Sequence, residues 1–293
     1  MSKQKKTTSN SGHPTKRRNN QIRTCVSVVC SFLLAMFLTV LLGAVAMRFG
    51  FFNREMTLNK INESDYYTNV YQELMENLKV IADSKEIPET VVTTVFTEKR
   101  VYINGKQFIE NSLNNNDTVV ERDAVEKELE TALRAYYKTK NVQITNAVQS
   151  DMDATIQAMT SEYTRMVRFQ FVDYIRKYKA AYDSVMKWLL PILAVLSVLL
   201  IAVLIKLHRY PHRGVRYIGI GLVSAGLINL ILPLVALIQR WYTDLGIQPD
   251  YYAEFLADYF KWSLYSFVYT GVISIVLSIG LFIWMRVLKN QIK

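Results

Sequence analysis

Few residues of this chain have the types and spacing that catalysis requires. The sequence has no Gly-rich phosphate loop and no HExxH, Gly-x-Ser-x-Gly or CxxC pattern. Its histidines are His13, near the N-terminus, and His208 and His212, on either side of Pro211. The last two lie among arginines, which makes them poor metal ligands. We therefore expect no catalytic residue, no cofactor and no metal site.

Two other polar groups have a chemical interpretation. Asp250, Glu254 and Asp258 recur at helical spacing and could bind a hard cation, but a solvated helix face explains them better because no second acidic cluster complements them. Asn229 is the sole strongly polar side chain in the interior of the apolar blocks, away from their ends. We expect it to form a hydrogen bond between helices rather than to bind a substrate.

Tyrosines give the strongest indication of binding. The candidate partner-facing residues are Tyr163, Tyr174, Tyr178 and Tyr182. They belong to a segment, Met152 to Leu207, in which apolar residues advance by three or four positions. The spacing predicts one continuous helix, with Ser150 and Asp153 as its capping box and Pro191 as a possible kink.

The chain alternates very apolar blocks with very polar segments. The blocks at 25–47, 185–207, 217–238 and 262–285 contain no charged residue except Lys187 and Lys206, which lie near the two ends of the second block. Each can span a bilayer as a helix. The predicted fold is an all-α integral membrane protein with four transmembrane helices. A large, mainly helical extracytoplasmic domain, residues 48–184, lies between the first two.

The distribution of lysine and arginine predicts the orientation. These residues are concentrated in three segments: 1–24, a basic tail that we expect to be disordered; 208–216, a short link; and 286–293, the C-terminal tail. By the positive-inside rule all three are cytoplasmic. Residues 48–186 carry 18 Lys and Arg against 21 Asp and Glu, so the net charge of +10 comes from the other segments. We expect a multi-pass protein of the cell membrane with both termini in the cytoplasm.

The first apolar block allows an alternative. Ala44-Val45-Ala46 resembles a signal-peptidase site, although the block is longer than a cleavable core usually is. The only cysteines are Cys25 and Cys30, at the cytoplasmic edge of this block, and lipidation of Cys25 is a further alternative. An exported domain without cysteines cannot use disulfides, which points to a bacterial protein.

Small residues suggest how the spans pack. Two stripes let another helix approach closely; they are Ser27, Ser31, Ala35, Thr39 and Gly43 in the first block, and Gly221 and Ala225, with Asn229, in the third. Packing within the chain is the simpler interpretation. A homo-oligomer or a partner subunit is the alternative.

Within the predicted domain, residues 91–109 are ambiguous. Their Val and Thr content and the Asn104-Gly105 pair are typical of a hairpin, but all neighbouring segments have helical patterns. We favour two helices with a turn at Asn104-Gly105. A helix from Thr118, with Glu121 completing its capping box, follows.

The loop at 239–261 contains an amphipathic helix opened by Pro249. We expect its aromatic stripe either to lie on the outer membrane interface or to pack against the membrane-facing side of the extracytoplasmic domain.

The layout is similar to that of permease subunits of cell-division and macrolide-exporter type ABC systems. One span, a large exported domain and three further spans carry this resemblance, which covers the chain in outline. It implies a transducer that works with a separate ATPase, although the link at 208–216 has no matching coupling segment. Our leading expectation is a non-enzymatic bacterial membrane protein whose exported domain binds a ligand or a membrane or cell-surface protein. We expect contact with the lipid bilayer and none with nucleic acid.

Overall fold

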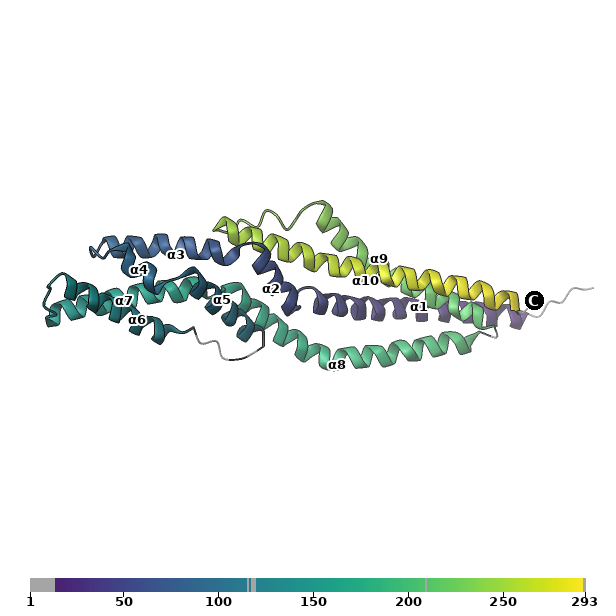
Figure 1. The fold of residues 1–293 in the computed structure, drawn as a ribbon. Coiled ribbons are helices and arrows are strands. Elements are labelled where there is room, and N and C mark those ends of the chain that lie inside the picture. The colour runs from purple at the N-terminus through teal and green to yellow at the C-terminus, as the bar shows by residue number, and fades with distance from the viewer. Residues whose placement is uncertain (1–13, 115, 117–119, 209, 292–293) are drawn as a thin grey trace, which may run out of the picture. The chain divides into compact units, whose positions relative to one another are not determined.

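The computed structural model describes residues 14–114, 116, 120–208 and 210–291. Over these residues it contains ten helices and no strand (Figure 1). Four segments are long and apolar enough to cross a membrane: Gln21–Phe49, Phe171–Leu207, Pro211–Ile238 and Asp250–Val287. The prediction of an all-helical fold is thus confirmed for the described residues, and the four predicted spans correspond to these four candidate helices.

The helices have the following bounds: α1 Pro14–Phe49, α2 Arg54–Glu63, α3 Tyr66–Asp83, α4 Glu89–Val95, α5 Glu98–Leu113, α6 Arg122–Thr139, α7 Asn146–Val167, α8 Gln170–Leu207, α9 Pro211–Ile238 and α10 Asp250–Gln291. The chain divides into two compact units. The span unit comprises Met1–Ala46, Met186–Val235 and Ser266–Lys293, and the core unit comprises Met47–Val185 and Ala236–Tyr265.

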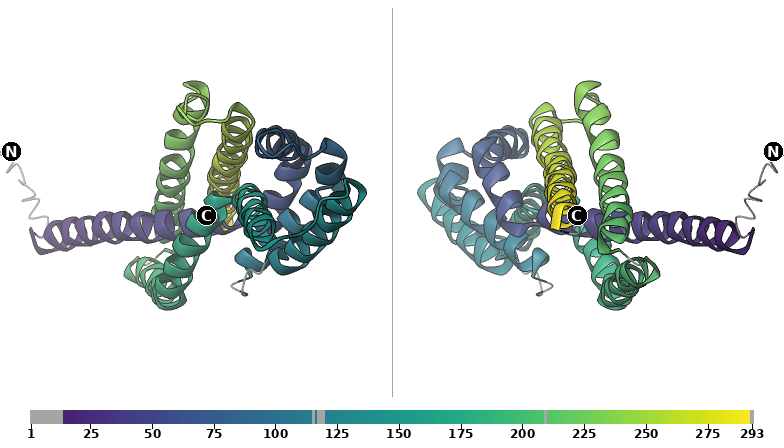
Figure 2. Two further views of the ribbon diagram at one scale, coloured as in Figure 1. Left: turned by 90° about the vertical axis from the view of Figure 1, so that its left-hand side faces the viewer. Right: turned by 90° about the vertical axis from the view of Figure 1, so that its right-hand side faces the viewer.

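The core unit is a bundle of amphipathic helices around one hydrophobic core. In α3, Val70, Leu74 and Leu78 recur every four residues and are almost fully buried, as one face of a helix requires. Helix α3 lies beside α7, and α7 lies beside α6; Figure 2 shows these blue to teal helices gathered together. Burial of each large apolar side chain stabilises such a bundle by roughly 1.5–3 kcal/mol.

Residues 91–109 are helical, as favoured, but the predicted turn is in the wrong place. The helical conformation is interrupted at Phe96 and Thr97, which are both extended. The Thr97 hydroxyl caps the next helix by accepting a hydrogen bond from the amide of Arg100. Helix α5 then continues through Asn104 and Gly105. The buried Phe96 side chain explains the position of the break, because an extended residue there directs the ring into the core.

The prediction of one continuous helix from Met152 is wrong. Helix α7 ends at Val167, Arg168 is extended, and α8 begins at Gln170. Between them Phe169 is 1% exposed, and its ring lies 5.1 Å from the ring of Tyr66 and 5.2 Å from that of Phe255. Tertiary packing of this aromatic ring overrides the helical spacing on either side of it.

Two predicted helix starts also need correction. Helix α7 begins at Asn146 and is capped by Thr145, whose hydroxyl accepts from the Val148 amide, so Ser150 and Asp153 lie inside the helix. Helix α6 begins at Arg122 with Glu121 in the cap position. Thr118, the other half of that predicted capping box, lies outside the described residues.

The segment predicted as a separate loop, 239–261, belongs to the core unit. Phe255, Leu256 and Tyr259 are buried in the same hydrophobic core as α3 and α7. The predicted amphipathic helix and the fourth span form one helix, α10, because no break separates them.

Candidate functional site

An apolar groove on the core unit is the best candidate for a binding site. We call it the aromatic groove; it is lined by Met47, Phe51, Phe52, Phe171, Tyr174, Ile175, Tyr178, Tyr182, Tyr259 and Phe260. Its volume is about 370 Å³, within the range of about 300–1,000 Å³ typical of small-molecule sites. Its exposed lining is almost wholly apolar.

Three segments supply the groove. In α8, Phe171, Tyr174, Tyr178 and Tyr182 recur three or four positions apart, with Ile175 beside them, and thus share one face. After α1 the chain turns, with the Phe52 amide donating to the Met47 carbonyl at 3.0 Å, and this turn presents Phe51 and Phe52. The early part of α10 contributes Tyr259 and Phe260.

Aromatic edges pack together to form one wall of the groove. The rings of Phe171 and Tyr259 are 5.5 Å apart, and those of Phe51 and Tyr259 are 6.1 Å apart, both edge to face. The Tyr259 hydroxyl donates to the carbonyl of Phe51. Such pairs contribute about 0.5–1.5 kcal/mol each beyond their buried area. They hold this part of the groove in a defined shape.

The rim of the groove is exposed. Tyr174 is 61% and Tyr178 is 64% exposed, while Tyr182 is half-buried and its ring lies 4.8 Å from that of Phe52. Three of the four tyrosines predicted to face a partner therefore line one groove. A surface of this composition can bind alkyl chains or aromatic rings, and it contains no nucleophile or acid–base pair.

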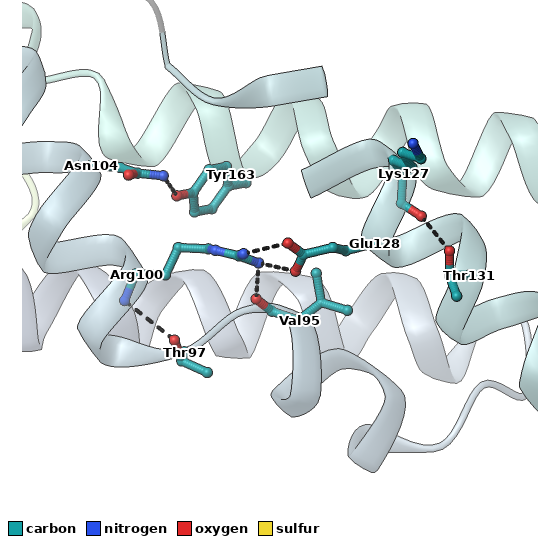
Figure 3. A network of polar contacts seen from close by, with 8 residues as sticks. All are labelled: Val95, Thr97, Arg100, Asn104, Lys127, Glu128, Thr131 and Tyr163. Atoms are coloured by element: carbon teal, nitrogen blue, oxygen red, sulfur yellow. Dashed lines mark hydrogen bonds and ion pairs between the residues drawn. The ribbon is translucent and has the colours of Figure 1, made fainter. Parts of the chain in front are cut away.

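Tyr163 needs correction as a partner-facing residue. It is fully buried, and its hydroxyl accepts a hydrogen bond of 2.7 Å from Nδ2 of Asn104, a contact between α5 and α7 (Figure 3). The helical spacing that grouped it with the other tyrosines does not extend across the break at Phe169. Its role is in the core.

Figure 3 also shows an ion pair that joins the helices around Tyr163. Arg100 donates two hydrogen bonds of 2.7 Å to the carboxylate of Glu128 and one of 2.8 Å to the carbonyl of Val95. The bond from Arg100 lowers the pKa of Glu128, and the same bond raises the pKa of Arg100. This bidentate pair fixes α5 against α6.

Ionisation of Tyr163 should cost stability at alkaline pH. Burial raises its pKa to about 12, against about 10 in an unfolded chain. The fold favours the neutral hydroxyl, so its stabilising contribution is complete below pH 10 and is lost as the pH rises towards 12. We expect the unfolding free energy of Tyr163→Phe to fall less steeply over this range than that of the wild type, by up to about 1.4 kcal/mol per pH unit. Denaturant titrations at several pH values measure the slopes, and equal slopes would contradict the burial of a titrating hydroxyl.

The first small-residue stripe packs against α9 within the span unit. The Ser31 hydroxyl donates to the carbonyl of Tyr217 at 2.8 Å, and Nδ2 of Asn229 donates to the carbonyl of Thr39 at 3.2 Å. A Cβ at Gly43 would lie 3.3 Å from Oδ1 of Asn229. Asn229 thus bridges two helices of one chain.

The remaining stripe residues lie in the same unit. A Cβ at Gly221 would be 3.2 Å from the carbonyl oxygen of Ser31, and the carbonyl of Ala225 accepts a second bond from Asn229 at 3.0 Å. Ala35 is buried. Ser27 Oγ lies 2.9 Å from Nε2 of His208.

Among the described residues, no group of three or more His, Cys, Asp or Glu is placed to hold a metal ion. Glu254 and Asp258 line a surface pocket together with Arg240 and Lys261, so cations lie beside these carboxylates. His13 lies outside the described residues.

Sequence reasoning missed most of the groove. Phe51 and Phe52 follow the first apolar block and Tyr259 lies in the segment 239–261, but no local pattern in the sequence joins these segments to the tyrosines of α8. The available signal was an accumulation of aromatic residues at the ends of three apolar blocks. Comparison with family models, with curated proteins and with solved structures finds no match for this chain.

Proposed function

We propose that this chain is a non-enzymatic bacterial membrane protein that binds an apolar ligand, a lipid alkyl chain, in the aromatic groove. The groove itself is the observation that carries the proposal. Its lining offers aromatic faces and two exposed tyrosine rings, and burying an alkyl chain against them stabilises a complex by roughly 25 cal/mol per Å² of apolar surface.

The groove residues support a ligand that comes from the bilayer. Met47 belongs to the first candidate span, Phe171 to Tyr182 begin the second, and Tyr259 and Phe260 belong to the fourth. Aromatic residues are enriched where spans leave the hydrocarbon layer. Met47, at the end of the first apolar block, and Tyr182, just before the second, form the part of the groove that a lipid from the bilayer would meet first.

In this proposal the protein lies in the cell membrane, and its core unit is on the extracytoplasmic side. The lysine and arginine residues at both ends of the chain and between α8 and α9 favour the cytoplasmic side for those segments. Lipid binding would serve sensing, scaffolding or an accessory role beside a membrane or cell-surface protein. The alternative, a transducer driven by a separate ATPase, remains a prediction that purification from native membrane tests.

Substituting the exposed rim of the groove should weaken lipid binding. We expect the double variant Tyr174→Gln/Tyr178→Gln of the full-length protein to bind phosphatidylcholine about 25-fold more weakly, if each ring contributes about 1 kcal/mol. Because both side chains are more than half exposed, the fold should be retained. Native mass spectrometry of the protein in detergent, titrated with the lipid, gives the affinities.

Trp241→Gln is the matched control, since Trp241 is 64% exposed and lies outside the groove. Its affinity should equal that of the wild type. Equal affinities for the groove variant and the wild type would refute the proposed function.

A further inference from the structure

A basic pocket adjoins the aromatic groove within the core unit. It has a volume of about 550 Å³, and the Phe52 side chain lines both cavities. Arg48, Arg54 and Lys179 line this pocket together with the carboxylate of Glu55. An apolar groove and a cationic pocket with a common wall match a molecule that has an alkyl chain beside an anionic group.

We infer that the ligand of the groove is a phospholipid with an anionic headgroup. Its alkyl chain lies in the groove, and its phosphate is bound by Arg48, Arg54 and Lys179. This inference rests on the proposed function, because it assigns the headgroup of the lipid whose chain the groove binds.

The arginine side chains of the pocket have N–H groups that can bind phosphate oxygens. Nη1 of Arg48 lies 3.4 Å from Asp183, and Nη2 of Arg54 lies 3.4 Å from Glu110. Charge-assisted hydrogen bonds are normally about 2.7–2.9 Å long, so both contacts are loose. A guanidinium carries several N–H groups in a planar fork that matches two phosphate oxygens.

Lys179 is also positioned to donate hydrogen bonds to the phosphate. Its ammonium donates to the carbonyl of Leu113 at 3.1 Å, which uses one of its N–H groups. Asp183 and Glu110 hold Arg48 and Arg54 at the pocket, and a phosphate would replace these two loose contacts with bidentate ones.

The position along the chain agrees with a headgroup site. Arg48 is the penultimate residue of the first candidate span, and Lys179 lies in the early part of the second. Cations at these places stand at the level of lipid phosphates when the spans are in a bilayer. The phosphate and the chain of one lipid can therefore meet the pocket and the groove together.

The test compares two lipids with identical acyl chains, phosphatidylglycerol and phosphatidylcholine, on the full-length protein in detergent. The wild type should prefer the anionic lipid. Since each basic residue contributes about 1 kcal/mol, Arg48→Gln/Arg54→Gln should reduce this preference about 25-fold. Lys177→Gln is the control, because Lys177 is exposed on α8 and does not line the pocket; it should leave the preference unchanged.

Each contrary result has a separate meaning. A wild type that binds both lipids equally, while Tyr174→Gln/Tyr178→Gln still weakens both, would overturn the headgroup assignment and leave the proposed function intact. An equal loss in Lys177→Gln would show general surface attraction and overturn the pocket. Displacement of phosphatidylglycerol by inorganic phosphate alone, with no effect of the tyrosine variant, would overturn both proposals in favour of a free anion.

Discussion

Replacing Gly105 with alanine is expected to destabilise the core unit by about 2 kcal/mol. Gly105 lies in the middle of α5. In the interior of a helix, alanine normally stabilises the helix by about 1 kcal/mol relative to glycine. Here a Cβ would lie 2.1 Å from Cε1 and 2.7 Å from Cζ of Tyr67. That ring cannot easily move, because Tyr67 is 4% exposed and packs against Tyr66 and Tyr102.

The thermal midpoint of helix loss, followed by circular dichroism of the full-length protein, measures this effect. A loss of about 2 kcal/mol corresponds to roughly 4–8 °C in a unit of this size. In a Tyr67→Leu background the same substitution should raise the midpoint, because the obstructing ring is absent and only the helix propensity remains. An increase in the midpoint of the single variant would contradict the close packing of α5 on α3.

Replacing Gly226 with leucine is expected to disrupt the span unit. A Cβ on Gly226 would lie 2.9 Å from the carbonyl oxygen of Gly271, so α9 and α10 cross here with their backbones in contact. Beside the crossing, the Ser274 hydroxyl donates to the carbonyl oxygen of Leu222 at 2.9 Å, and the Ser278 hydroxyl donates to that of Gly219 at 2.8 Å. Forcing the helices apart combines overpacking, about 1–3 kcal/mol, with two lost bonds of about 0.6 kcal/mol each.

Heat inactivation in detergent, followed by the fraction that remains monodisperse, measures this loss. The control is Gly280→Leu, in the partner helix α10, because a Cβ there meets nothing within 4 Å. The control should retain the wild-type profile while Gly226→Leu aggregates at a temperature several degrees lower. Identical profiles for the two leucine variants would contradict the glycine crossing.

Gly105 illustrates what the sequence could and could not predict. Its neighbour Asn104 makes an Asn-Gly pair, which is a strong turn signal. The glycine in fact serves the approach of Tyr67, a residue 38 positions earlier in the sequence. Helical periodicity and the four apolar blocks are local signals and predicted the elements well. Contacts between distant segments have no such local signal.

The groove shows the same limit. Tyr174, Tyr178 and Tyr182 were predicted as a binding face because they recur on one helix. The other walls, Phe51 to Phe52 and Tyr259 to Phe260, come from segments about 120 and 80 residues away from them. Tyr163 was misassigned because the chain departs from the helix at Phe169, where an aromatic cluster outweighs the local preference.

Photolabelling tests the central proposal, a lipid chain in the aromatic groove, most directly. The full-length protein is reconstituted with a phospholipid that carries a photoreactive group on its alkyl chain near the headgroup, and labelled peptides are identified by mass spectrometry. We expect labelling to concentrate on residues 47–52, 171–182 and 259–260. In the variant Tyr174→Gln/Tyr178→Gln, the amount of label on these peptides should decrease. Labelling spread evenly over exposed span residues such as Val195, Leu199 and Val276, with no excess at the groove, would contradict the proposal.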